Sequence, residues 1–247
     1  MSYLPYPKNR SPRPALVPKW VIAWMAAIPL CYLLVAGARA LAADVHGQMV
    51  LGTYRPATSP KPPRPAFNWE IDNGVKEVLR DRVAATRELA VVLVGPGAST
   101  LPDHIEIALS GGTLLPSTVV VRAGTTVRIR NDDEIGHELY ADGLDGLSPE
   151  ATSPKAIRSV HLTKPGSWPL HDRLAPHAHA QLHVLVDLLA VAKVESNGTF
   201  AFSDVAPGKY TLKVLHGADE IATREIEVGD KALALDPLSL VNPRATP

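Results

Sequence analysis

The sequence predicts an all-β fold, an antiparallel sandwich or barrel, behind one N-terminal transmembrane helix. From about Glu88 onward, short runs of β-branched and alternating residues are separated by Gly and Pro, and no run has a convincing helical period. The transmembrane helix is predicted by the uncharged apolar run WVIAWMAAIPLCYLLVAG over residues 20–37. That run is close to the ~20 residues that an α-helix needs to cross a bilayer.

Composition and charge narrow the class of protein. Of the 247 residues, 46% are hydrophobic and 20% are charged, which is typical of a chain that buries a core. The formal net charge is zero and no basic face is evident, so nucleic acid is not an expected partner. The single cysteine, Cys31, lies inside the apolar run, so the exported part is expected to have no disulfide framework.

The N-terminal region predicts the compartment. Residues 1–19 form a Pro-rich tail with four basic residues and no acidic one, which the positive-inside rule places in the cytoplasm. Residues 20–42 are then a transmembrane anchor, although Ala40-Leu41-Ala42 would also suit cleavage of a secretory signal. Under either interpretation the folded part lies on the periplasmic or extracytoplasmic side of the cytoplasmic membrane.

Residues 43–87 are expected to be a linker and wrapping segment. Residues 53–64 are rich in Pro, Ser and Lys and have no apolar periodicity. Between Trp69 and Arg87, apolar residues are spaced as on one side of a short amphipathic helix. An irregular segment wrapped across a sheet is the alternative.

Residues 88–189 are expected to form the first β unit. The run LAVVLVG is apolar on both faces, whereas HIEIALS alternates, with Ile105, Ile107 and Leu109 on one face. The run TVVVRAGTTVRIRN holds two strands joined at Ala123-Gly124, with Val127 and Ile129 facing inward.

The second of these strands leads into a recognisable motif. It consists of a proline, a strand, the pattern G-T-x-V-x-I-x-N-x-D and then a histidine. The matching positions are Pro116, Val119, Val121, Gly124, Thr125, Val127, Ile129, Asn131, Asp133 and His137. This pattern resembles the cupredoxin (plastocyanin-like) family, which implies a Greek-key β-sandwich. The resemblance also implies that His137 holds the first copper-ligand position and that an Asn-Asp turn braces its loop.

The second half of the cupredoxin pattern is incomplete. Pro165-Gly166 matches a turn and Pro176-His177 matches a proline-histidine pair, but the cysteine position, within residues 170–173, holds no thiol. The methionine position, near residues 178–180, is empty as well. A blue-copper centre needs the thiolate, so electron transfer through such a centre is not expected.

Histidines offer another arrangement. His177, His179 and His183 share parity and would lie on one face of a strand, with His171 close in sequence. Together with His137 they are candidate ligands of a histidine-only metal site, because imidazole binds Cu(II), Zn and Ni. The competing interpretation is that these histidines are solvated or hydrogen-bonded to a neighbour. Copper is the cofactor that the metal-binding alternative would use, and no cofactor follows from the rest of the sequence.

Residues 190–229 are expected to form a smaller β unit. Asn197-Gly198 and Pro207-Gly208 are turn signals between alternating strands. The pattern G-x-F-x-F-x-D-V-x-P-G-x-Y-x-L resembles carboxypeptidase regulatory-like (transthyretin-like) sandwich domains, in which these positions are framework residues. The unit is short, so it is expected to borrow an early strand such as Val45 to Leu51 or to pack on the first unit. Residues 230–247 are expected to be a flexible tail.

No positive signal for catalysis is present, because the sequence lacks a G-x-S-x-G elbow and a phosphate-binding glycine loop. The expected function is therefore that of an exported, membrane-anchored cupredoxin-like protein without the ligand cysteine. It would act as a structural or interaction module, for example as a subunit of a membrane complex with a protein partner. The alternative is a copper-binding or copper-handling protein with a histidine-only site.

Overall fold

The computed structural model describes residues 42–54, 83–99 and 101–241. The predicted cytoplasmic tail, the predicted transmembrane helix and most of the predicted wrapping segment lie outside these ranges. Within them the chain is all-β, as predicted, with one short α-helix, α2 (Ala85–Glu88), and one 3-10 turn (Leu51–Thr53). None of the helices in this part of the chain has the length and hydropathy needed to cross a membrane.

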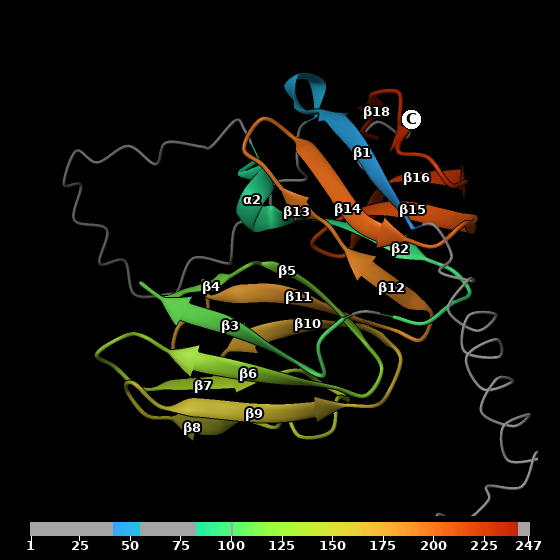
Figure 1. Ribbon diagram of the computed structural model, residues 1–247. Coiled ribbons are helices and arrows are strands. Elements are labelled where there is room, and N and C mark those ends of the chain that lie inside the picture. Colours follow the sequence, from blue (N-terminus) through green and yellow to red (C-terminus); the bar gives the residue numbers. More distant parts are fainter. Residues whose placement is uncertain (1–41, 55–82, 100, 242–247) are drawn as a thin grey trace, which may run out of the picture. The chain divides into compact units, whose positions relative to one another are not determined.

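The first sandwich consists of two sheets (Figure 1). One sheet has the order β5 (Thr118–Arg122), β11 (His179–Leu185), β10 (Gly166–Asp172), β7 (His137–Tyr140) and β8 (Glu150–Thr152). The other has the order β4 (Thr113–Leu115), β3 (His104–Ser110), β6 (Thr125–Asn131) and β9 (Ile157–Leu162).

Alternation of side chains builds the core of this first sandwich. Along β6 every second residue is buried, so Val127 and Ile129 face inward while Arg128 and Arg130 remain partly exposed. On β3, Ile107 and Leu109 are buried, as the alternation predicts. These side chains pack with Leu139, Leu170 and their neighbours in one continuous apolar cluster.

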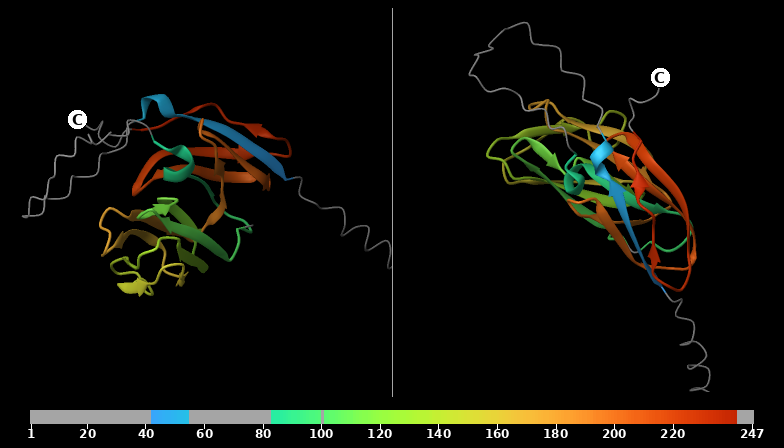
Figure 2. Two further views of the ribbon diagram at one scale, coloured as in Figure 1. Left: turned by 90° about the vertical axis from the view of Figure 1, so that its left-hand side faces the viewer. Right: turned by 90° about the horizontal axis from the view of Figure 1, so that it is seen from above.

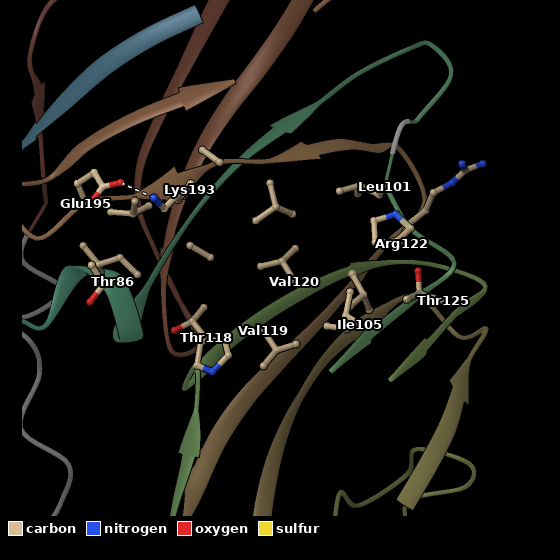
Figure 3. Close-up of a pocket in the computed structure, with 18 residues that line it drawn as sticks. Thr86, Leu101, Ile105, Thr118, Val119, Val120, Arg122, Thr125, Lys193 and Glu195 are labelled. Carbon is tan, nitrogen blue, oxygen red and sulfur yellow. Dashed lines mark ion pairs between the residues drawn. The ribbon is translucent and has the colours of Figure 1, made fainter. Parts of the chain in front are cut away.

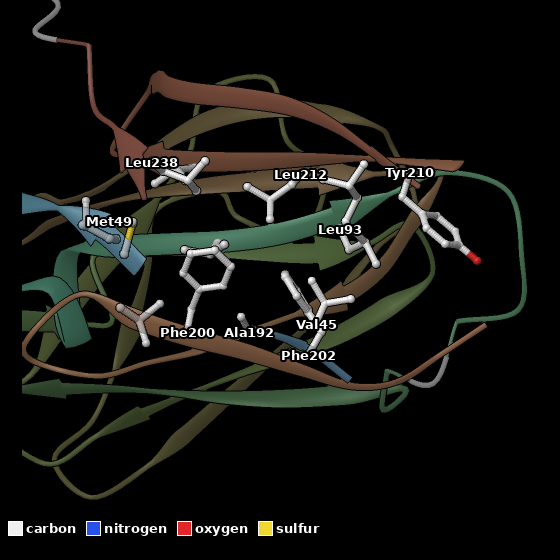
Figure 4. Close-up of a cluster of buried hydrophobic side chains, with 14 of the residues drawn as sticks. Val45, Met49, Leu93, Ala192, Phe200, Phe202, Tyr210, Leu212 and Leu238 are labelled. Atoms are coloured by element: carbon white, nitrogen blue, oxygen red, sulfur yellow. The ribbon is translucent and has the colours of Figure 1, made fainter. Parts of the chain in front are cut away.

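The second sandwich also has two sheets. One contains β13 (Lys193–Val194), β14 (Thr199–Val205), β1 (Ala43–Val50) and β17 (Leu233–Ala234), with β18 (Leu238–Ser239) also paired to β1. The other has the order β12 (Leu188–Val191), β2 (Leu89–Val94), β15 (Gly208–His216) and β16 (Asp219–Val228). Its core includes Met49, Leu93, Phe200, Phe202 and Leu212 (Figure 4).

The early strand β1 is part of this second sandwich, which is one of the two arrangements that the shortness of the unit predicts. It runs antiparallel to β14, with Gly47 opposite Phe200. In both views of Figure 2 the blue strand lies against orange and red strands that are distant in sequence. Val45 and Met49, on its inner face, are at most 1% exposed.

The boundaries between the two sandwiches differ from those that the sequence predicts. β2 and β12 belong to the second sandwich, although β2 falls within the predicted first unit of residues 88–189 and β12 crosses the predicted end of that unit. The reason lies in the run LAVVLV: Val91 and Leu93 enter the core of the second sandwich, and the opposite face enters a separate apolar cluster. When a strand is buried on both faces, its sequence pattern alone does not show which of the two sandwiches it joins.

The predicted flexible tail of residues 230–247 also differs from the structure. Strands β17 and β18 fall within it, and both pair in parallel with β1. The alternating leucines explain this pairing, because Leu238 and Leu240 are buried in the second core while Leu233 and Leu235 pack against it.

Contacts between the two sandwiches include both apolar and polar groups. Val120 of β5 packs with Val92 and Leu215 in a shared cluster. Nearby, the backbone N–H of Gly217 donates to Thr118 Oγ1 at 2.8 Å, and His183 Nε2 lies 2.7 Å from the carbonyl oxygen of Gly217.

Candidate functional site

His137 is completely buried at the start of β7. Its Nδ1 is hydrogen-bonded to Oδ2 of Asp172, and its Nε2 lies 3.2 Å from Oδ2 of Asp133. Both ring nitrogens therefore face carboxylate oxygens.

Asp172, at the end of β10, is fixed in place by burial and by hydrogen bonds to the backbone. Its side chain is fully buried, and its Oδ1 accepts hydrogen bonds from the backbone N–H groups of Glu138 at 3.1 Å and Leu174 at 2.9 Å. Asp172 falls within residues 170–173, where the cupredoxin resemblance implies a cysteine. At that point this chain directs a carboxylate toward His137.

Asp133 contacts the other side of the His137 ring and also links its own turn to the turn at Gly111 and Gly112. Its carboxylate accepts hydrogen bonds from the backbone N–H groups of Gly111 and Gly112. The Gly112 N–H is the largest cause that lowers the pKa of Asp133; the Gly111 N–H and His137 lower it further, and partial burial opposes them.

Asn131 completes the brace that the resemblance implies. Its Oδ1 accepts from the backbone N–H of Asp133 at 2.9 Å, and its Nδ2 donates to the carbonyl oxygens of Ile135, Thr152 and Ser153. Because Asn131 is itself buried, these bonds fix the loop between β6 and β7.

The hydrogen-bonding capacity of this cluster is internally matched. Carboxylate oxygens can accept hydrogen bonds, and each ring nitrogen of His137 lies against one of them. Buried polar groups are tolerated when they are hydrogen-bonded in this way. The cluster of Asp133, His137 and Asp172, called the Asp-His-Asp cluster below, can thus act as a brace between three loops.

The remaining candidate histidines lie elsewhere. His171 and His179 are directly opposite each other on β10 and β11, and the ring of His171 lies 5.6 Å from that of Tyr140. His179 Nδ1 lies 2.8 Å from the carbonyl oxygen of His177. His183 is buried against Gly217, and desolvation lowers its pKa.

His177 and His137 are not brought together directly. A β-carbon on Gly112 would stand 2.6 Å from His177 Nε2, so the His177 ring packs against the turn that Asp133 holds. Contacts thus run from His137 through Asp133 and Gly112 to His177.

A copper ion does not fit this arrangement. Both nitrogens of His137 are engaged by carboxylates, and the described residues contain no group of three or more His, Cys, Asp or Glu side chains placed to hold a metal. The structure therefore supports no chemical step that passes through a metal at His137.

The sequence alone does not identify Asp133 and Asp172 as partners of His137. For Asp133 the cupredoxin resemblance implies only a place in the Asn-Asp turn that braces the loop. For Asp172 a signal was present, because it shares the inward parity of Leu170 along β10. An acidic residue at an inward strand position requires a buried partner.

Comparisons with known proteins give similarities to solved structures only. No protein-family model matches the sequence, and no curated protein matches it. Amicyanin from Paracoccus versutus is 19% identical over 34% of this chain and 85% of amicyanin, with a TM-score of 0.31. A purple cupredoxin from Nitrosopumilus maritimus is 17% identical over 32% of this chain and 97% of that one, with a TM-score of 0.29.

A third solved structure is the copper-containing nitrite reductase of Thermus scotoductus. It is 22% identical, and the match covers 37% of this chain and 24% of the reductase, with a TM-score of 0.30. Each of these similarities concerns about a third of this chain.

Proposed function

We propose that this chain is an exported, membrane-anchored, cupredoxin-like protein that acts as a non-catalytic structural or interaction module. The observation that carries the proposal is the Asp-His-Asp cluster, in which carboxylates engage both ring nitrogens of His137. In this proposal the cluster replaces a metal as the brace of the loops at that end of the first sandwich.

The Asp-His-Asp cluster and the neighbouring Asn131 support an interaction role because they hold the backbone of two exposed apolar residues. Ile135 is 61% exposed, and its carbonyl oxygen accepts from Asn131. Leu174 is 58% exposed, and its backbone N–H donates to Asp172. Large apolar side chains held out to solvent by a rigid loop are suited to contact a protein partner.

A metal titration tests the first part of the proposal. Cu(II) and Zn(II) are titrated by calorimetry into the full chain in detergent, beside the double variant His137→Ala, His177→Ala. The expected result is the same heat for both proteins, because His137 offers no free nitrogen. Stoichiometric binding that disappears in the double variant would overturn the proposal.

Crosslinking in cells tests the interaction role. A photoreactive amino acid is placed at Ile135, at Leu174 or, as a matched control, at Val186, which is 64% exposed in the turn between β11 and β12. We expect discrete protein adducts at the first two positions and none at the third. Identical adduct patterns at all three positions would contradict the role.

The second candidate function is metal binding by a different histidine pair. His171 and His179 face each other across an antiparallel pair of strands, where opposite β-carbons are about 5 Å apart. Such a pair can place two imidazoles on one Cu(II) or Zn(II) ion. Binding that is lost in His171→Ala, His179→Ala and retained in His137→Ala would favour this candidate.

Membrane attachment and the second sandwich form the remaining part of the proposal. The proposed anchor ends at residue 42, and β1 begins at Ala43 and pairs with β14. The second sandwich, proposed to be of the carboxypeptidase regulatory-like kind, would thus be joined directly to the anchor. Alkaline extraction of cell membranes tests the attachment: the full chain is expected in the pellet, and release into the supernatant would contradict it.

A further inference from the structure

A cavity of about 450 Å³ lies beside β5. Five consecutive residues of the first sandwich, Thr118–Arg122, line one side, and five consecutive residues of the second, Val191–Glu195, line another. The volume is in the range of small-molecule sites, which is about 300–1,000 Å³.

The cavity follows the length of β5. The lining run Thr118–Arg122 spans about 13 Å, because a strand rises about 3.3 Å per residue. Figure 3 shows Thr86, Lys193 and Glu195 at one end and Leu101, Arg122 and Thr125 at the other, with Val120 between them. A linear molecule suits this form better than a compact one.

The middle of the cavity is apolar. Val119, Val120 and Val121 are all at most 7% exposed, and the apolar residues Leu89 and Ala90 also line the cavity. The hydroxyl of Thr118, another lining residue, already donates to the Glu88 carbonyl oxygen and accepts from Gly217. This stretch therefore favours a hydrocarbon body over a polar one.

Charge is asymmetric between the two ends. At one end Lys193 Nζ is paired with Glu195 Oε1 at 2.9 Å, so that end is balanced. At the other, Arg122 is exposed and forms no ion pair among the described residues. A guanidinium at the rim of an apolar slot is complementary to a carboxylate.

We propose that this cavity binds a single-chain amphiphile with an anionic headgroup, such as a fatty acid. Its hydrocarbon chain would lie along Val120, and its carboxylate would face Arg122. This inference is independent of the function proposed for the Asp-His-Asp cluster.

Photolabelling of the full chain in native membranes tests the proposal. The probe is a dodecanoate analogue with a photoreactive group on its chain, and mass spectrometry maps the adducts. Adducts are expected on peptides that contain Thr118–Arg122 or Val191–Glu195, and an excess of dodecanoate should compete them away. Absence of adducts on both peptides would overturn the proposal.

A matched pair of variants separates the cavity from the surface around it. Val191 is 39% exposed and lines the cavity, whereas Val186 is 64% exposed and does not. Val191→Trp should lower cavity labelling by about fivefold or more by filling the slot, and Val186→Trp should not change it. Equal labelling of the two variants would overturn the proposal.

The headgroup assignment is tested with a neutral alcohol analogue of the same chain length. Arg122→Gln should lower labelling by the carboxylate analogue by roughly three- to tenfold, since it removes a charge-assisted contact, and should leave labelling by the alcohol unchanged. An equal effect on both analogues would overturn the anionic assignment.

Discussion

Asp172 determines what the end of the first sandwich can do, because its carboxylate occupies Nδ1 of His137. Two backbone N–H groups hold its other oxygen, so the carboxylate has little freedom to leave. A single residue thus makes a position that resembles a metal-ligand site part of a buried, hydrogen-bonded brace.

Removal of this carboxylate is expected to be costly. Asp172→Asn should lower the local free energy of unfolding of β7 and β10 by about 3–5 kcal/mol, as for other broken buried pairs. The measurement is hydrogen exchange of the β7 and β10 amides. Asp142→Asn, at an exposed turn, is the control and should stay within about 0.5 kcal/mol. An equal effect of the two changes would contradict the brace.

Thr152 lies directly opposite His137, and its replacement is expected to leave the free energy of unfolding unchanged or to raise it. Its buried hydroxyl has no hydrogen-bond partner among the described residues. Thr152→Val should therefore be neutral or stabilising by up to about 1 kcal/mol, whereas Thr118→Val, which removes two bonds, should cost about 1–3 kcal/mol. Thermal unfolding of the two variants decides the order, and a reversed order would contradict it.

Around His137, the sequence predicts where residues lie along the chain better than it predicts which side chains are hydrogen-bonded to each other. The resemblance places Asn131 in a turn that braces the loop before His137, as the structure has it. It does not identify Asp172 as a partner of His137, because the contact joins residues 35 apart on strands β7 and β10. Such pairing depends on sheet order, which periodicity along one strand does not contain.

At the scale of elements, β1 is the strand on which the second sandwich depends. It pairs with β14, β17 and β18, so three segments of the sheet meet along it. Its Gly47 is packed tightly, because a β-carbon there would stand 2.3 Å from Cζ of the buried Phe200 ring.

Gly47→Ala is therefore expected to destabilise the second sandwich by about 1–3 kcal/mol, the usual cost of overpacking a core. Gly52→Ala is the matched control, because no heavy atom lies within 4 Å of a β-carbon at that position, and it should change stability by less than about 0.5 kcal/mol. Hydrogen exchange of β14 measures both. A Gly47→Ala chain as stable as the control would contradict the packing.

The sequence predicts most elements but not which sheet they join. The alternation over residues 104–110 and the turn at Asn197-Gly198 both appear as expected. β17 and β18 were not predicted, because each has only two paired residues and depends on β1 for its partner. Short strands far from their partner carry too little pattern to be recognised.

At the scale of the whole molecule, His183 connects the two sandwiches through its hydrogen bond to Gly217. Desolvation lowers the pKa of His183 below its usual 6.5, so the folded chain binds fewer protons than the unfolded chain beneath that pH. The contribution of His183 to stability is therefore complete above about pH 6.5 and is lost as the pH falls toward the lowered pKa.

Thermal unfolding of the full chain between about pH 7.5 and about pH 5 checks this sign. The wild-type chain should lose stability as the pH falls, and His183→Asn, which keeps a donor but does not titrate, should lose less. His46→Asn, on the partly exposed side of β1, is the control and should follow the wild type. A larger pH effect in His183→Asn than in the wild type would contradict the interpretation.

The most direct test of the central claim is the ¹H–¹⁵N spectrum of the histidine ring nitrogens of the full chain during a Zn(II) titration. If Asp133 and Asp172 engage both nitrogens of His137, its two ring signals should stay in place while exposed histidines are free to shift. A stoichiometric displacement of the His137 Nδ1 signal to that of a metal-bound nitrogen would contradict the claim.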